Sequence, residues 1–85
     1  MKEFTYTITD AQGIHARPAG LLVKEASGLD CSITLAMDGK EVDAKRILAV
    51  MGLGARQGSV VTLKADGADE EKAIDKLSAF LKANL

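Results

Sequence analysis

Residues 13–28 read GIHARPAGLLVKEASG, and this stretch decides the fold because both ends of a helix are marked within it. Pro18 would cost about 3 kcal/mol inside a helix, but in the first turn it loses no hydrogen bond and so places the helix start near Ala16. Gly28 is the expected C-terminal stop. The apolar residues between them recur at i, i+3, i+4 and i+7, the stripe of one helix face: Ala19, Leu22, Val23 and Ala26.

Strands are predicted on both sides of this helix. Before it, threonines alternate with the large side chains of Phe4, Tyr6 and Ile8, a period of two that is typical of a strand. After it, alternation at Ile33, Leu35 and Met37 predicts a second strand, and Asp38-Gly39 is typical of a two-residue hairpin turn into a third strand through Val42. A fourth strand has Val61, Leu63 and Ala65 on its inward side.

Two further helices are expected. Residues 43–51 read as a short helix that ends before Gly52 and Gly54. The last helix is capped by Asp69, with Glu70 and Glu71 in its positive first turn and Lys82 near its negative end. Its buried face is predicted to contain Ala73, Leu77, Phe80, Leu81 and Asn84, with Ile74 at the edge.

The predicted order is βαββαβα in one domain over residues 1–85. Three layers would need a longer chain, so we expect an α/β (α+β) fold: a two-layer open-faced sandwich, a four-stranded antiparallel sheet with three helices on one face. The outward strand positions are polar and suit a sheet face that meets water: Thr5, Thr7, Thr9, Ser32, Thr34, Thr62 and Lys64.

Composition excludes several classes of function. Eleven Lys and Arg against twelve Asp and Glu leave a net charge of −1, which argues against a nucleic-acid-binding domain. Cys31 is the only cysteine, so an internal disulfide is excluded and a reducing cytosol is expected. No apolar run reaches the roughly 20 residues that span a bilayer, and residues 1–10 lack a signal-peptide core. We therefore expect a cytoplasmic protein that does not insert into membranes.

His15 is the only histidine, and it lies at or just before the start of the first helix. Unpaired backbone N–H groups and the positive end of the helix dipole make such a position a site for an anion, for which a phosphoryl group is suitable. The same potential favours the neutral ring, whose lone pair can attack phosphorus. Arg17 adds a planar, permanently charged group that can hold phosphate oxygens. A lone histidine at a helix start is also common as a surface or capping residue.

A docking surface is a second candidate feature. The first helix has a basic, partly apolar face beside its core stripe, formed by Arg17, Gly20, Leu21 and Lys24. The short second helix has more apolar residues than one face can bury, namely Ile47, Leu48 and Met51, although core packing also explains such residues. If the two surfaces are adjacent, they form a patch around His15.

Other chemistries lack the residues they need. One histidine and one cysteine, separated by a helix and a strand, supply no metal-ligand cluster. The serines lack a nucleophile elbow, so a hydrolase triad is not expected. The glycines of residues 52–58 lack the spacing and lysine of a nucleotide-binding loop and read as turns.

The motif GIHARPA at residues 13–19 resembles HPr, the phosphocarrier family of the phosphoenolpyruvate-dependent sugar phosphotransferase system. The likeness continues through residues 23–26, 38–40, 50–51, 57–58 and 67–70. It implies that His15 accepts a phosphoryl group on Nδ1 from enzyme I and donates it to sugar-specific IIA components. It further implies that Arg17 balances the charge, that the amides of Ala16 and Arg17 receive the phosphate, and that the partners dock on Gly20, Leu21, Lys24, Ile47, Leu48 and Met51. No metal or organic cofactor is implied, and we expect a monomeric carrier rather than an enzyme.

One residue departs from the family pattern. Many Gram-positive HPr proteins have a regulatory serine where this chain has Arg46, and arginine cannot accept that modification. Two alternatives stay open: an interaction module of HPr ancestry without phosphate turnover, and a small nucleic-acid-binding domain that uses Arg17, Lys24, Lys45 and Arg46. The sequence does not identify the sugar, because selectivity would lie in the partners.

Overall fold

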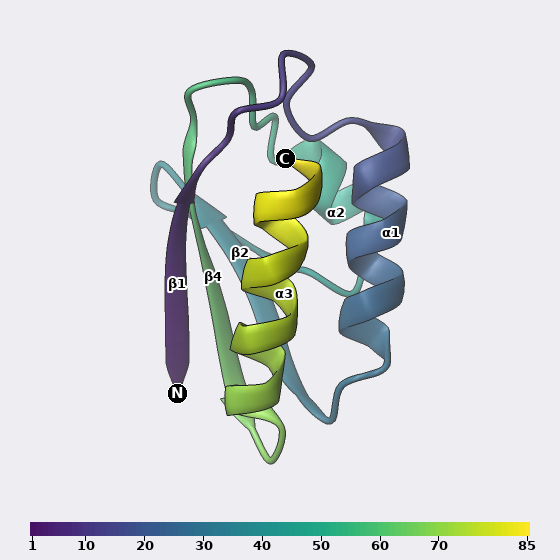
Figure 1. Ribbon diagram of the computed structural model, residues 1–85, viewed down its shortest axis with the longest axis vertical. Coiled ribbons are helices and arrows are strands. Elements are labelled where there is room, and N and C mark those ends of the chain that lie inside the picture. The colour runs from purple at the N-terminus through teal and green to yellow at the C-terminus, as the bar shows by residue number, and fades with distance from the viewer.

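The computed structural model describes all 85 residues as a four-stranded sheet with three helices. The elements are β1 (Lys2–Thr7), α1 (Ala16–Ser27), β2 (Cys31–Met37), β3 (Lys40–Asp43), α2 (Ile47–Gly52), β4 (Val60–Gly67) and α3 (Glu70–Asn84). The strand order in the sheet is β1-β4-β2-β3, and every pair of neighbours is antiparallel. All three helices cover one face (Figure 1), so the predicted open-faced sandwich is confirmed. None of the helices combines the length and the apolar character that crossing a bilayer requires.

The core lies between the sheet and the helices. On β4, Val61, Leu63 and Ala65 are fully buried, as their alternation predicts, and Leu22 of α1 and Leu77 of α3 close over them. Burial of each such leucine contributes about 1.5 to 3 kcal/mol relative to an exposed side chain. The other sheet face is polar, and there the hydroxyls of Thr5 and Thr62 lie 3.3 Å apart across β1 and β4.

The prediction of a helix over residues 43–51 is wrong at both ends. The helix begins at Ile47 and includes Gly52. Asp43 instead belongs to β3, where it pairs with Thr34, and its Oδ1 accepts a hydrogen bond from the backbone N–H of Lys45 at 2.9 Å. This local side-chain bond stabilises a turn in place of the first helical turn.

Two predictions for α3 also need correction. Asp69 stands at the N-cap position, but its side chain makes no capping bond. Its Oδ2 instead accepts from the N–H of Asp30 at 2.8 Å, which ties the start of α3 to the start of β2. Asn84 is exposed rather than buried, because its amide donates to the carbonyl of Phe80, while Leu85 is turned inward.

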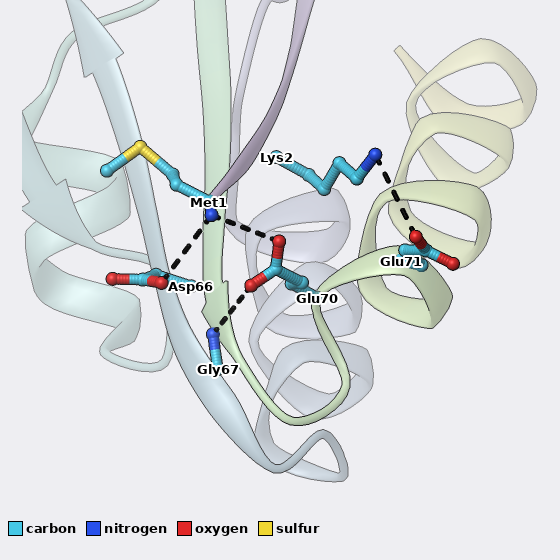
Figure 2. Close-up of polar contacts among 6 residues, drawn as sticks. All are labelled: Met1, Lys2, Asp66, Gly67, Glu70 and Glu71. Atoms are coloured by element: carbon cyan, nitrogen blue, oxygen red, sulfur yellow. Dashed lines mark hydrogen bonds and ion pairs between the residues drawn. The ribbon is translucent and has the colours of Figure 1, made fainter.

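An ion-pair cluster joins the start of β1 to the start of α3 (Figure 2). The amino group of Met1 lies 3.0 Å from Glu70 Oε2 and 3.7 Å from Asp66 Oδ1, and Glu70 Oε1 accepts from the N–H of Gly67. The hydrogen bond from the amino group, helped by that of Gly67, lowers the pKa of Glu70, and the same contact raises the pKa of the amino group. The cluster is solvent-exposed, so it fastens the strand without a large effect on stability.

Candidate functional site

His15 is the N-cap residue of α1. Its backbone is extended (φ −107°, ψ −179°), its carbonyl accepts the N–H of Ala19 at 3.0 Å, and its side chain makes no capping hydrogen bond. The ring is 38% exposed, and its Nε2 lies 3.9 Å from Oδ2 of Asp10. The imidazole is therefore accessible to solvent at the N-terminus of α1, and its ring nitrogens are not used to cap the helix.

The loop that carries His15 is fastened to the segment before β4. Gly13 is buried at φ +66°, and a Cβ on this residue would lie only 2.4 Å from the carbonyl oxygen of Ala55. The N–H of Ile14 donates to that same oxygen at 3.1 Å, and the amide of Gln57 donates to the carbonyl of Thr9. This structural role of Gly13 and Ala55 was not predicted from the sequence, although a glycine two residues before His15 was a usable signal of a position that needs a positive φ.

A shallow depression of about 180 Å³ lies beside the ring. It is lined by Asp10, His15, Arg17, Pro18, Leu21 and Asn84. The amides of Ala16 and Arg17 belong to the first turn of α1, where N–H groups have no intrahelical acceptor. The depression is smaller than the roughly 300 to 1,000 Å³ of small-molecule pockets, so it suits a group the size of a phosphoryl rather than an organic ligand.

The largest hollow of the surface lies elsewhere. It surrounds the start of α3 and is lined mainly by charged side chains, including Asp69, Glu71 and Lys76. The end of α3, in contrast, is the part of that helix that lies near the His15 loop (Figure 1). The hollow is wide open and holds no histidine, so we place the candidate site at the smaller depression.

The structure brings the two predicted docking surfaces together. A Cβ on Gly20 would lie 3.6 Å from Cδ1 of Ile47, so α1 and α2 touch at this point. Four apolar side chains of the two helices are exposed: Leu21 (42%), Ile47 (41%), Leu48 (82%) and Met51 (39%). Lys24 is exposed on α1, and we call these five residues, with Arg17 and Gly20, the docking patch. Val50 is the buried residue that anchors α2 to the core.

Arg46 and Cys31 do not line the depression at His15. Arg46 is exposed at the N-cap position of α2. Cys31 lies at the start of β2, and Figure 1 shows that α1 runs from the His15 loop toward that end of the molecule. Burial raises the pKa of the Cys31 thiol, which opposes reactivity as a thiolate. No three His, Cys, Asp or Glu side chains are grouped so that they could hold a metal ion.

Comparison with known proteins identifies the class. The family described as the PTS HPr component phosphorylation site matches residues 2–83. HPr-C-His from Thermoanaerobacter tengcongensis is 46% identical, with 98% of this chain and 93% of that chain covered and a TM-score of 0.93. The histidine-containing phosphocarrier protein of Mycoplasma is 36% identical, with 96% and 93% covered and a TM-score of 0.94.

A third similar structure is Crh, the catabolite repression containing protein of Bacillus subtilis, which is described as a domain-swapped dimer. It is 39% identical, with 94% of this chain and 92% of that chain covered and a TM-score of 0.79. The fold, the motif and these likenesses together define a phosphocarrier of the phosphotransferase system. The chain belongs to the HPr family.

Proposed function

We propose that this chain is a phosphoryl carrier whose His15 accepts a phosphoryl group from phosphorylated enzyme I and passes it to sugar-specific IIA components. The observation that carries the proposal is the free imidazole at the start of α1: it is the only histidine, it makes no capping bond, and it shares its depression with Arg17. Likeness to HPr supports the identity of the two partners.

The transfer is a displacement at phosphorus. The lone pair of Nδ1 forms a new N–P bond while the bond from phosphorus to the donor breaks, and its electron pair returns to the donor. Arg17 and the amides of Ala16 and Arg17 stabilise the phosphoryl oxygens, because fixed donors at a helix start act where the charge lies. The second transfer reverses these steps on an IIA acceptor. We propose no metal or organic cofactor on this chain, which is a covalent carrier and not an enzyme.

The docking patch suits this role because donor and acceptor can visit the same exposed site in turn. Leu21 of the patch lines the depression at His15, the exposed apolar residues of α2 adjoin α1 where Ile47 approaches Gly20, and Lys24 and Arg17 add positive charge. An interface of this composition, with an apolar centre and a charged rim, is typical of transient protein contacts. We propose that the chain works as a monomer in the cytoplasm.

We test carrier function and docking in one experiment. Incubation with enzyme I, magnesium and radioactive phosphoenolpyruvate should label the chain with an acid-labile phosphoryl group, which a panel of IIA proteins then removes. The Leu48→Glu variant should be labelled roughly 10- to 100-fold more slowly at low enzyme I, because a charge replaces an exposed apolar side chain at the interface, a loss of about 1.4 to 2.8 kcal/mol of binding free energy.

Val60→Glu is the matched control. Val60 is also exposed, at 53%, but lies on the water-facing side of the sheet beside the inward-facing Val61. Its variant should be labelled at the wild-type rate. A wild-type chain that stays unlabelled with several enzyme I proteins would favour the non-carrier interaction module, whereas equal slowing of both variants would contradict the assignment of the patch.

Arg46 leads to a separate prediction about regulation. Incubation with HPr kinase and ATP should leave no acid-stable phosphate on the wild type, because the N-cap position of α2 has a guanidinium and no hydroxyl. An Arg46→Ser variant should become a substrate, since Ser at this exposed position restores the hydroxyl that the family pattern contains. Phosphoserine in the wild type would contradict the proposed loss of this switch.

A further inference from the structure

Asp10 is the only acidic side chain that lines the depression at His15. The loop holds it firmly. Its N–H donates to the main-chain oxygen of Leu85 at 2.7 Å, and its carbonyl accepts from Gly13 at 2.9 Å. Its Oδ1 accepts the N–H of Gln12 at 2.8 Å, a local turn in which the carboxylate is fixed two residues before its donor.

With Oδ1 engaged, the other carboxylate oxygen is left to face the histidine. Oδ2 lies 3.9 Å from Nε2 of His15, and neither side chain is fully exposed: 31% for Asp10 and 38% for His15. Contacts of catalytic groups are often long in unliganded proteins and shorten when the partner binds. A carboxylate only accepts hydrogen bonds, so it favours the ring tautomer with its proton on Nε2.

We infer, on the basis of the function proposed above, that Asp10 is a positioning residue that holds the His15 proton on Nε2 and leaves the lone pair on Nδ1 to attack phosphorus. A phosphoryl group on Nε2 would instead lie against Oδ2, where two negative charges repel each other. The geometry thus favours Nδ1 as the attachment atom.

Asp10 also acts after transfer. Nδ1 has then donated its lone pair to phosphorus while Nε2 keeps its proton, so the ring is positively charged. Asp10 Oδ2 is the carboxylate oxygen that faces this proton, and it stabilises the charged ring. The opposing charges make phosphorylated His15 easier to form.

The Asp10→Asn variant tests this inference with the loop preserved. The Oδ1 of the asparagine can still accept a hydrogen bond from the N–H of Gln12. With Oδ1 held in this way, the side-chain NH2 of the asparagine takes the position of Asp10 Oδ2. A donor facing Nε2 favours the opposite tautomer. Nitrogen-15 spectra of the unphosphorylated chain should show mainly Nε2–H in the wild type and a roughly 5- to 10-fold shift toward Nδ1–H in Asp10→Asn, the range that one hydrogen bond supplies. The rate of labelling by enzyme I should fall by a similar factor.

Asp43→Asn is the matched control, because Asp43 makes the same turn with Lys45 but lies on β3 and outside the depression. It should leave the tautomer and the labelling rate unchanged. A second variant, Asp10→Ser, keeps a turn acceptor and removes the carboxylate, so it should give a mixture of tautomers. Equal tautomer populations in wild type, Asp10→Asn and Asp10→Ser would overturn the role of Asp10, whether or not the chain is labelled. A tautomer shift in a chain that enzyme I does not label would support the role of Asp10 and contradict the proposed function.

Discussion

Replacing His15 with alanine is expected to abolish acid-labile labelling by enzyme I and phosphoenolpyruvate. The chain has no other imidazole, so a phosphoramidate of histidine cannot form anywhere else. The substitution should not unfold the protein. The ring is 38% exposed and makes no capping bond, so the free energy of unfolding should change by no more than about 0.5 kcal/mol, as for surface positions in general. Radioactivity retained at neutral pH and lost in acid measures the first effect, and urea denaturation measures the second.

Ser27→Ala is a suitable control for this variant. Ser27 is an exposed hydroxyl in the last turn of the same helix, at the opposite end from His15. Removal of the Ser27 hydroxyl should leave the extent of labelling equal to that of the wild type. Labelling of His15→Ala equal to that of the wild type would contradict the site, and loss of labelling in Ser27→Ala would show that a hydroxyl contributes to the acceptor.

Local signals explain which parts of the fold were predictable. Pro18 marks the start of α1 by its fixed φ and its missing N–H, and the structure has the helix from Ala16 to Ser27. Gly28 follows the last turn as predicted, but at a right-handed φ of −83° rather than in the left-handed conformation that favours glycine. The strand order β1-β4-β2-β3 was not predicted, because pairing of Thr5 with Thr62 joins residues far apart in the chain. The start of α2 was misplaced because Asp43 forms a strand pair and a turn, and the helical pattern of neighbouring apolar residues does not reveal that competition.

In the candidate site, too, features set by local sequence were predictable, whereas features set by contacts between distant residues were not. His15 and Arg17 were recognisable because their positions relative to the helix start depend on Pro18, which follows them by three residues and one residue. The sequence predicted a docking patch only on the condition that the exposed faces of α1 and α2 are adjacent. The close approach of Gly20 to Ile47 shows that the two helices are in contact. Asp10 had no sequence signal as a partner of His15, because its direction depends on bonds to Gln12, Gly13 and the distant Leu85.

Gly13→Ala is expected to destabilise the protein by about 3 to 4 kcal/mol, close to the upper end of single substitutions. Part of this cost comes from the backbone conformation, because alanine adopts a φ of +66° at a free-energy cost of about 1 to 2 kcal/mol relative to glycine. The larger part is overlap, because the new Cβ would lie 2.4 Å from the carbonyl oxygen of Ala55 and 2.6 Å from Cα of Arg56. Both are backbone atoms, so the loop itself must move. His15 moves with that loop, and a displacement of about 1 Å can slow a reaction 100-fold.

Gly54→Ala separates the two contributions. Gly54 has a similar positive φ of +74°, but a Cβ there would meet no atom within 4 Å. Its variant therefore carries the conformational cost alone, about 1 to 2 kcal/mol, and should be labelled by enzyme I at the wild-type rate. The difference between the two unfolding free energies measures the overlap at Ala55. Equal destabilisation by the two substitutions would mean that the His15 loop tolerates displacement from Ala55, and that the close contact at Gly13 does not hold the histidine in place.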